Sequence, residues 1–387
     1  QEVRTRWGSA LRDFKKMKKI IIIVFTWLFI LNAVNLVSFF TLKDRTSYEL
    51  PPGISLKLRQ ITVPWLNSDG RNYLKIVTNG YTEEHHIDLR VFFPLYPALI
   101  KTLSLGFLNP VLVGLSVSYI SFFAMLALFN KLLIDEGYKD DVRTKILILM
   151  LVFPTSYYFV AYYTESLFLL LVLAFFYFLN RKKINVATIF AILASATRVT
   201  GLALMAPLIW ETFLTFKKER KINWSVIFAP AGFIFHFLYL QFATGDGASV
   251  ITSQSDWNKP IGLFAPFIGF YDGLRKFIFG SEITSGDFFG RSMEIIEFIT
   301  AVALILMLIK SYKKIKTTYW LYMVASVIPI YFSGVFSSVH RYALVFFPMF
   351  IYLVKAIPRK RFVAVSLTSL LLLIYLAALF LRNYWVA

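Results

Sequence analysis

Continuous apolar runs of about 20 residues recur along this chain, as at 20–40 and 362–381. A run of that length crosses the hydrocarbon core of a bilayer as one α-helix, whereas the strands of a membrane β-barrel would alternate apolar and polar residues. The composition agrees, because 58% of the 387 residues are hydrophobic and only 16% are charged, too few for the surface of a soluble domain. The sequence therefore predicts an all-α polytopic membrane protein with one membrane-embedded domain, 1–387.

Basic residues set the expected orientation of the helices. A group of lysine and arginine residues between positions 4 and 19 precedes the first apolar run, and the positive-inside rule places this group in the cytoplasm. The first run is too long for a cleaved signal peptide and lacks a small-residue cleavage site. Threading from there gives about eleven transmembrane helices and keeps every tight Lys/Arg cluster on the cytoplasmic side. The expected spans are 20–40, 109–133, 146–162, 166–179, 185–197, 202–216, 224–242, 293–309, 319–335, 342–355 and 362–381.

The charge balance also bears on partners. A formal net charge of +19 would suit a nucleic-acid-binding protein, but the basic residues gather at the ends of the expected spans. We therefore attribute the excess to anionic lipid headgroups and expect no nucleic-acid partner. The chain has no cysteine, which excludes a disulfide framework, a thiolate metal site and a thiol nucleophile.

Two hydrophilic stretches, 41–108 and 244–290, are expected as external loops. The first contains a polar segment that begins at Asp69 and ends in the sequence Phe-Phe-Pro-Leu-Tyr-Pro at 92–97. The apolar stretch 92–107 that starts with this sequence is too short to span a bilayer and carries two prolines, so it predicts an interfacial helix.

Two charged residues fall in tight hairpins on the external side. Glu165 and Arg198 each lie between two expected spans that are joined by very little loop. A charge at this depth costs about 2.5–3.5 kcal/mol on insertion scales unless it is paired or hydrated. Either residue is therefore expected to line a cavity or to form an ion pair.

Several stretches resemble one family in the same order along the chain. They are Asp69-Gly70-Arg71-Asn72-Tyr73-Leu74-Lys75-Ile76, Phe92-Phe93-Pro94-Leu95-Tyr96-Pro97, Tyr163-Thr164-Glu165-Ser166-Leu167-Phe168, Ser195-Ala196-Thr197-Arg198-Val199-Thr200-Gly201, and Arg341-Tyr342 followed by Phe347-Pro348. Together they cover roughly 60–350 and resemble the PIG-V-like mannosyltransferases. The family usually has Trp before the acid, where this chain has Ser68, with Trp65 further upstream.

The resemblance implies the GT-C architecture, in which a multi-span membrane enzyme takes one sugar from a polyprenyl-phosphate donor on the external side. Asp69 is then the expected general base. Its spacing alone also fits a helix cap. Arg198 is the first candidate to bind the donor phosphate, followed by Arg341 and His340, because guanidinium groups pair well with phosphate oxygens. The alternative for these cations is contact with lipid headgroups.

Further residues are expected to contact the substrates. Glu165 can either orient Arg198 or bind the sugar, and a buried structural pair is the alternative. An acidic cluster at 83–88 with two adjacent histidines suggests a solvated loop more than a divalent-metal site, so no metal or cofactor is expected. The other candidates for substrate contact are Glu84, Asp88, Tyr96 and Trp257.

The leading hypothesis is a membrane glycosyltransferase that moves one sugar, expected to be mannose, from a polyprenyl-phosphate donor to a hydroxyl group of a glycan or glycolipid acceptor, with inversion. It would act as a monomer in a prokaryotic plasma membrane with its site outside, or in the ER membrane of a eukaryote. Two alternatives stay open. A transporter or flippase would favour internal repeats and charges at mid-bilayer depth, and a noncatalytic subunit of a membrane complex would bind donor lipid without transferring the sugar.

Overall fold

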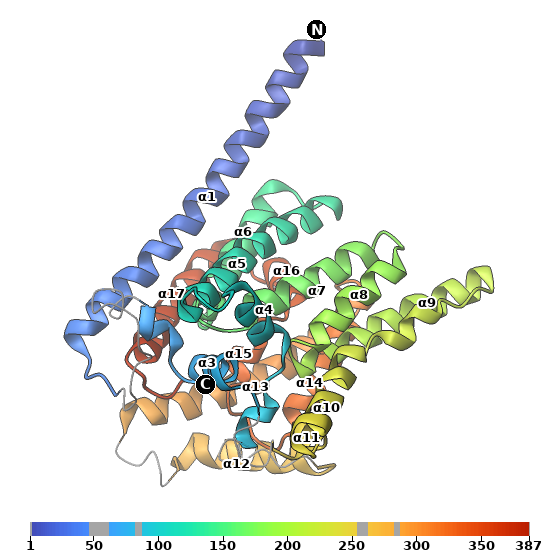
Figure 1. The fold of residues 1–387 in the computed structure, drawn as a ribbon. Coiled ribbons are helices and arrows are strands. Elements are labelled where there is room, and N and C mark those ends of the chain that lie inside the picture. The colour runs from blue at the N-terminus through green and yellow to red at the C-terminus, as the bar shows by residue number, and fades with distance from the viewer. Residues whose placement is uncertain (1, 46–61, 82–86, 254–261, 282–286, 387) are drawn as a thin grey trace.

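The computed structural model describes residues 2–45, 62–81, 87–253, 262–281 and 287–386, and the described part of the chain is helical without strands (Figure 1). The prediction of an all-α protein is therefore confirmed. Six helical stretches are long and apolar enough to cross a membrane. They are Lys18–Thr41 within α1 (Glu2–Thr41), α5 (Pro110–Asp135), Val199–Glu219, Trp224–Thr244, α13 (Phe288–Ser311) and α17 (Arg359–Leu381).

Two of these stretches join a short 3₁₀ helix to an α-helix. Val199–Glu219 combines η4 (Val199–Leu204) with α9 (Met205–Glu219), and Trp224–Thr244 combines η5 (Trp224–Phe228) with α10 (Ala231–Thr244). Pro207 and Pro230 lie near the two junctions, where the missing N–H of proline is tolerated at the first turn of a helix.

The other five expected spans coincide with shorter helices. These are α6 (Asp140–Leu151), α7 (Glu165–Leu179), α8 (Ile184–Ser195), α14 (Thr317–Phe332) and α16 (Phe347–Ala356). At 1.5 Å per residue, the 15 residues of α7 extend over about 22 Å, less than the hydrocarbon thickness of about 30 Å. Length therefore supports six spans, and the expectation of eleven stays a prediction.

The expected span 146–162 differs from the structure. The α-helix α6 ends at Leu151, and a separate 3₁₀ turn, η3 (Ser156–Phe159), follows it. Pro154 explains the break, because proline cannot donate to the helical hydrogen-bond ladder and disfavours helical geometry in the residue before it. The predicted interfacial helix at 92–107 is shorter than expected and is observed as α4 (Leu95–Leu103).

The helix α7 forms the centre of the molecule, packed between α5 and α8. Phe168, Val172 and Phe175 on this helix are fully buried, and the helix is apolar on every side. A helix that is hydrophobic all round needs neighbours on all sides. The interior position of α7 matters for the site because its first residue is the acid Glu165.

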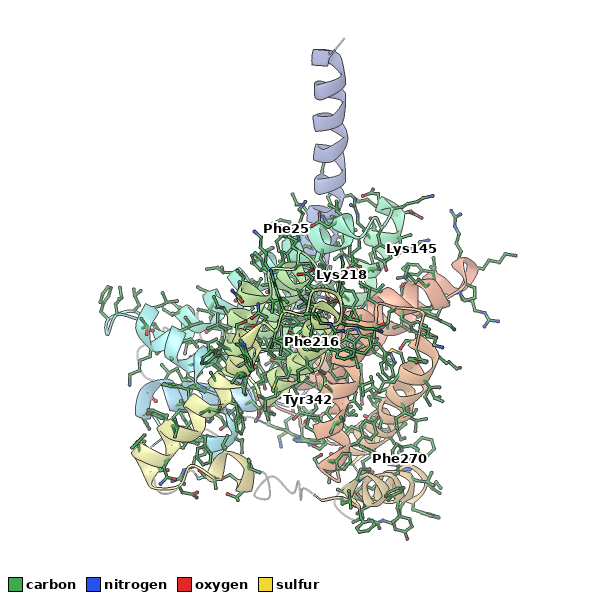
Figure 2. The ribbon with its side chains drawn as sticks, turned by 90° about the vertical axis from the view of Figure 1, so that its right-hand side faces the viewer. Phe25, Lys145, Phe216, Lys218, Phe270 and Tyr342 are labelled. Carbon is green, nitrogen blue, oxygen red and sulfur yellow. The ribbon has the colours of Figure 1, made fainter. Side chains whose placement is uncertain are left out.

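One end of the bundle is held by ion pairs between loop-side charges. Arg181 pairs with Asp135, Lys182 with Glu211 at 2.5 Å, and Lys316 with Glu136 at 2.8 Å. These contacts join the ends of α5, α7 and α14 to one another and to the middle of α9. In Figure 2 Lys145 lies toward the same end as the start of α1, whereas Tyr342 and Phe270 lie toward the opposite end.

Short elements complete the opposite end. In chain order they are η1 (Val63–Leu66), α3 (Asp69–Asn79), η2 (Ile87–Val91), α11 (Ser249–Thr252), α12 (Ala265–Phe279) and α15 (Val339–Ala343). Figure 1 shows α3, α11, α12 and α15 clustered there, away from the start of α1. None of these elements is long enough to span a bilayer, so they cover this end of the bundle instead of crossing it.

Candidate functional site

Four charged side chains meet where short elements begin. Asp69 is the first residue of α3, and Glu165 is the first residue of α7. Arg198 has an extended backbone immediately before η4, and Arg341 lies in the five-residue helix α15. Acidic side chains are favoured in the first turn of a helix, because the unpaired N–H groups there carry partial positive charge.

The four side chains form one continuous ion-pair cluster. Nη1 of Arg341 donates to Oδ2 of Asp69 at 2.5 Å, and Nε of Arg341 donates to Oε1 of Glu165 at 2.6 Å. Nη1 of Arg198 donates to the same Glu165 oxygen at 2.6 Å. We call Asp69, Glu165, Arg198 and Arg341 the charged quartet. With two carboxylates and two guanidinium groups, its formal charge is zero.

Burial makes the quartet electrostatically strong. Glu165 is 0% exposed and Arg341 is 4% exposed, whereas the Asp69 side chain retains 20% exposure. The Arg341 guanidinium also lies over the ring of Tyr163, 4.6 Å from its centre, and over that of Tyr158 at 5.0 Å. Removing one partner of such a buried pair leaves an uncompensated charge, at a cost of about 3–5 kcal/mol.

A cavity of about 270 Å³ opens beside the quartet. Asp69, Arg198 and Arg341 line it, whereas the more deeply buried Glu165 does not. Five residues with hydroxyl groups also line it: Thr197, Thr200, Ser333, Ser337 and Ser338. The lining therefore offers a ligand an anionic group, two cationic groups and neutral polar residues.

The rest of the cavity wall is apolar. Val199 and Ile251 line it and are also partly exposed on the outer surface of the protein. Phe93 of the Phe-Phe-Pro-Leu-Tyr-Pro sequence and Phe233 of α10 lie beside them, with their ring centres 6.0 Å apart. The arrangement suits a ligand that joins a charged group to a hydrocarbon portion.

Asp69 does not act as the N-cap of α3. Ser68 occupies that position, with the positive φ of 55° that is uncommon for a residue other than glycine. The Asp69 carboxylate instead turns to Arg341 from a distant part of the chain. The next residue, Gly70, lies close to the backbone of Tyr162. A Cβ atom at position 70 would be 3.3 Å from the Tyr162 carbonyl oxygen, which is closer than most Cβ contacts.

Other predicted site residues lie outside the cavity. His340 is buried and donates from Nε2 to the carbonyl oxygen of Val386 at 2.6 Å. The hydroxyl group of Tyr96 donates to the carbonyl oxygen of Gly114 at 3.0 Å and lies 2.9 Å from the Ser118 hydroxyl. Both side chains therefore form internal hydrogen bonds, and neither lines the cavity.

Three expectations concern parts of the chain that lie outside the described residues. Glu84 and Trp257 belong to 82–86 and 254–261, and the side chain of Asp88 is likewise not described. Most of the acidic cluster at 83–88 falls there too. Among the described residues, no group of three or more His, Asp or Glu side chains is placed to hold a metal ion.

Some residues around the site gave no clear signal in the sequence. The Thr164 hydroxyl accepts from Arg198 at 3.2 Å and lies 3.4 Å from that of Tyr73. Glu297 of α13 accepts from the backbone N–H of Ser338 at 2.8 Å, and Trp385 lines the cavity. Glu297 could have been noticed in the sequence, because it is an acid within an apolar run and such an acid usually has a partner or a function.

Comparisons of the chain with protein-family models, with curated proteins and with solved structures found no match. Function must therefore be inferred from the chemistry of the charged quartet and its cavity.

Proposed function

We propose that this protein is a membrane glycosyltransferase that transfers one sugar, mannose by the motif resemblance, from a polyprenyl-phosphate donor to a hydroxyl group of a glycan or glycolipid. The observation that carries the proposal is that Asp69, Arg198 and Arg341 line one cavity whose remaining wall is largely apolar. A polyprenyl-phosphate sugar has the same division, with a charged phosphate between a polar sugar and a hydrocarbon chain. The protein is proposed to act without a metal or cofactor.

The arginines would bind the donor phosphate. The hydrogen bonds recorded among the described residues use only Nη1 of Arg198 and only Nε and Nη1 of Arg341. Both side chains retain further N–H groups and line the cavity. Their positive charge would stabilise the phosphate as it leaves the sugar carbon, because charge stabilisation is strong in a site shielded from water. Glu165 would keep both guanidinium groups in place.

Asp69 would remove the proton from the acceptor hydroxyl. Its contact with Arg341 uses Oδ2, and the side chain is the more exposed of the two carboxylates of the quartet. A carboxylate within hydrogen-bond reach of the hydroxyl makes the oxygen a better nucleophile. The oxygen then bonds to the sugar carbon from the face opposite the phosphate, the carbon–oxygen bond to phosphate breaks, and the configuration inverts.

The orientation of the helices supports an external site. Glu165 begins α7, and Arg181 and Lys182 follow its end, so the quartet lies at the opposite end of this helix from the basic loop. The positive-inside rule favours the cytoplasm for the basic loop. The quartet would then face outward, where polyprenyl-phosphate sugars are used in the family that the motifs resemble.

The test is transfer by the purified full chain in lipid nanodiscs. Radiolabelled polyprenyl-phosphate mannose and a total membrane-lipid extract would be supplied, and products resolved by chromatography and mass spectrometry. We expect labelled glycolipid or glycan from the lipid-linked donor and none from a sugar nucleotide. Asp69→Asn can still accept from Arg341, and the Asp69 side chain is 20% exposed, so we expect the variant to fold with a smaller loss of stability than a change at the fully buried Glu165 would cause. We expect it to lose transfer by roughly 10³-fold.

Two outcomes would contradict the proposal. Transfer at the wild-type rate by Asp69→Asn would remove Asp69 as the base. Absence of transfer from mannosyl, glucosyl and galactosyl polyprenyl phosphates by a folded wild-type chain would reject the glycosyltransferase, and movement of the lipid across vesicle bilayers in the same preparation would support a flippase.

A further inference from the structure

The segment that follows α17 is held firmly beside the cavity. The helix ends at Leu381, and Asn383 reverses the chain with a positive φ of 57°. Arg382 donates to Asn35 of α1 at 2.9 Å, and the Asn383 side-chain oxygen accepts from Arg71 at 2.7 Å. These bonds connect the segment to α1 and to the helix that begins with Asp69.

Within this segment an exposed tryptophan, Trp385, lies between two buried neighbours. Tyr384 is 6% exposed and packs with its ring centre 4.0 Å from the Arg45 guanidinium carbon. Val386 is 0% exposed, and its carbonyl oxygen accepts from His340. Trp385 is 52% exposed and lines the cavity. The backbone is thus fixed on both sides of a large, rigid ring with a free surface.

The two anchors of this segment bring Trp385 to the Asp69 side of the site. Arg71, which binds Asn383, lies two residues after Asp69 on α3. His340, which binds the carbonyl group of Val386, immediately precedes Arg341. The apolar wall around Phe233 and Val199 instead adjoins Arg198, since Val199 is its neighbour in the chain. Trp385 therefore lines the same cavity as Asp69, in a segment bonded to the elements that carry Asp69 and Arg341.

We propose that Trp385 binds the acceptor, with its indole ring packed against the face of a hexopyranose ring whose hydroxyl group reaches Asp69. This inference rests on the proposed transferase function and extends it by naming the acceptor class and its subsite. One face of a pyranose ring presents C–H groups and the rim presents hydroxyl groups, so a flat aromatic ring and a carboxylate recognise it together. Aromatic side chains supply large contact area at low conformational cost.

The kinetic test uses the full chain in nanodiscs with saturating polyprenyl-phosphate mannose and octyl α-D-mannopyranoside as the acceptor probe. We expect Trp385→Leu to raise the acceptor KM roughly ten-fold and to change the donor KM by less than about two-fold, whereas Trp385→Phe recovers most of the loss. Trp224→Leu is the matched control, because Trp224 is 67% exposed and does not line the cavity. Equal acceptor KM values for the Leu and Phe variants would overturn the proposal and indicate contact with an alkyl chain.

A binding measurement separates failure of this inference from failure of the transferase assignment. The chain would be labelled with 5-fluorotryptophan, and the ¹⁹F resonance of residue 385 assigned by its absence in Trp385→Phe. We expect this resonance to shift saturably with a methyl α-pyranoside of mannose, glucose or galactose and not with glycerol. A shift in a chain that transfers nothing would support the sugar subsite and reject only the transferase. No shift with any of the three glycosides in folded protein would overturn the subsite.

Discussion

At the scale of single residues, Glu165 is the centre of the site although it does not line the cavity. One of its oxygens accepts from Arg198 and from Arg341, both at 2.6 Å. The other oxygen is buried and has no hydrogen-bond partner among the described residues. Glu165 therefore acts as a positioning residue that holds both guanidinium groups against their mutual repulsion.

Replacing Glu165 by Gln should lower both stability and donor binding. The amide retains a similar shape but loses the charge that compensates two arginines, so we expect a loss of about 3–5 kcal/mol in the free energy of unfolding and a higher donor KM. Thermal unfolding in nanodiscs and donor titration would measure these effects. Glu136→Gln is the control, because Glu136 pairs with Lys316 at the other end of the bundle. It should lower stability and leave the donor KM unchanged.

His340 predicts a pH dependence of stability. Burial lowers the pKa of His340 to about 4. The hydrogen bond to the Val386 carbonyl opposes this shift by raising the pKa, and the positive charge of Arg341 lowers the pKa further. The unfolded chain, with a histidine pKa of about 6.5, binds more protons between those values. The stabilisation is therefore complete above pH 6.5 and is lost as the pH falls toward 4, by about 3 kcal/mol in total.

The measurement is denaturant or thermal unfolding of wild type and His340→Gln across this pH range. Glutamine can still donate to Val386 but does not titrate, so the variant should lose stability less steeply in acid. An identical acid slope in both proteins would show that His340 is not the group that titrates.

At the scale of elements, short helices that begin at the site set the positions of its side chains. The helix α15 has only five residues, and its N-cap residue Ser338 has a positive φ of 65°. Glu297 of α13 accepts from the Ser338 N–H and so connects a long helix to the turn that carries Arg341. A positive φ in a residue other than glycine persists only where its surroundings enforce it.

Glu297→Ala should therefore disturb Arg341 from a distance. Loss of the acceptor leaves a buried N–H group unsatisfied, at a cost of about 1–3 kcal/mol in stability, and should raise the donor KM. Glu294→Ala is the matched control from the same helix, because Glu294 pairs with Arg291 at 3.3 Å and not with α15. Equal donor KM values for the two variants would indicate that α15 holds its position without Glu297.

The sequence predicted part of this arrangement and not the rest, for physical reasons. Long apolar runs identify helices by composition. Glu165 and Arg198 stood out because charges are expensive near a membrane, whereas Asp69 and Arg341 were identified through the motif resemblance. The break at Pro154 could have been read from proline geometry, but the 146–162 stretch is apolar apart from Thr155, Ser156 and the tyrosine hydroxyl groups. The position of Trp385 at the cavity depends on the turn at Asn383 and on contacts between distant segments, which no local pattern encodes.

At the scale of the whole molecule, the direction of the bundle decides which solution the cavity faces. The chain has no native cysteine, so single cysteines can be introduced without a background. We expect a membrane-impermeant maleimide to label Asp246→Cys in intact cells and Lys182→Cys only after permeabilisation, because the two positions lie near opposite ends of the bundle and both are exposed. The reverse pattern would place the charged quartet on the cytoplasmic side and would contradict an external site.

The neutrality of the charged quartet also determines how a ligand arrives. A patch of uncompensated arginines would attract anions through solution, and its association rate would fall steeply as ionic strength rises. Four charges that cancel within a few ångströms produce little field at a distance, so capture must depend on lateral diffusion and close contact. Donor affinity should accordingly vary little between low and physiological salt, as expected if the proposed transferase finds its substrate within the plane of the bilayer.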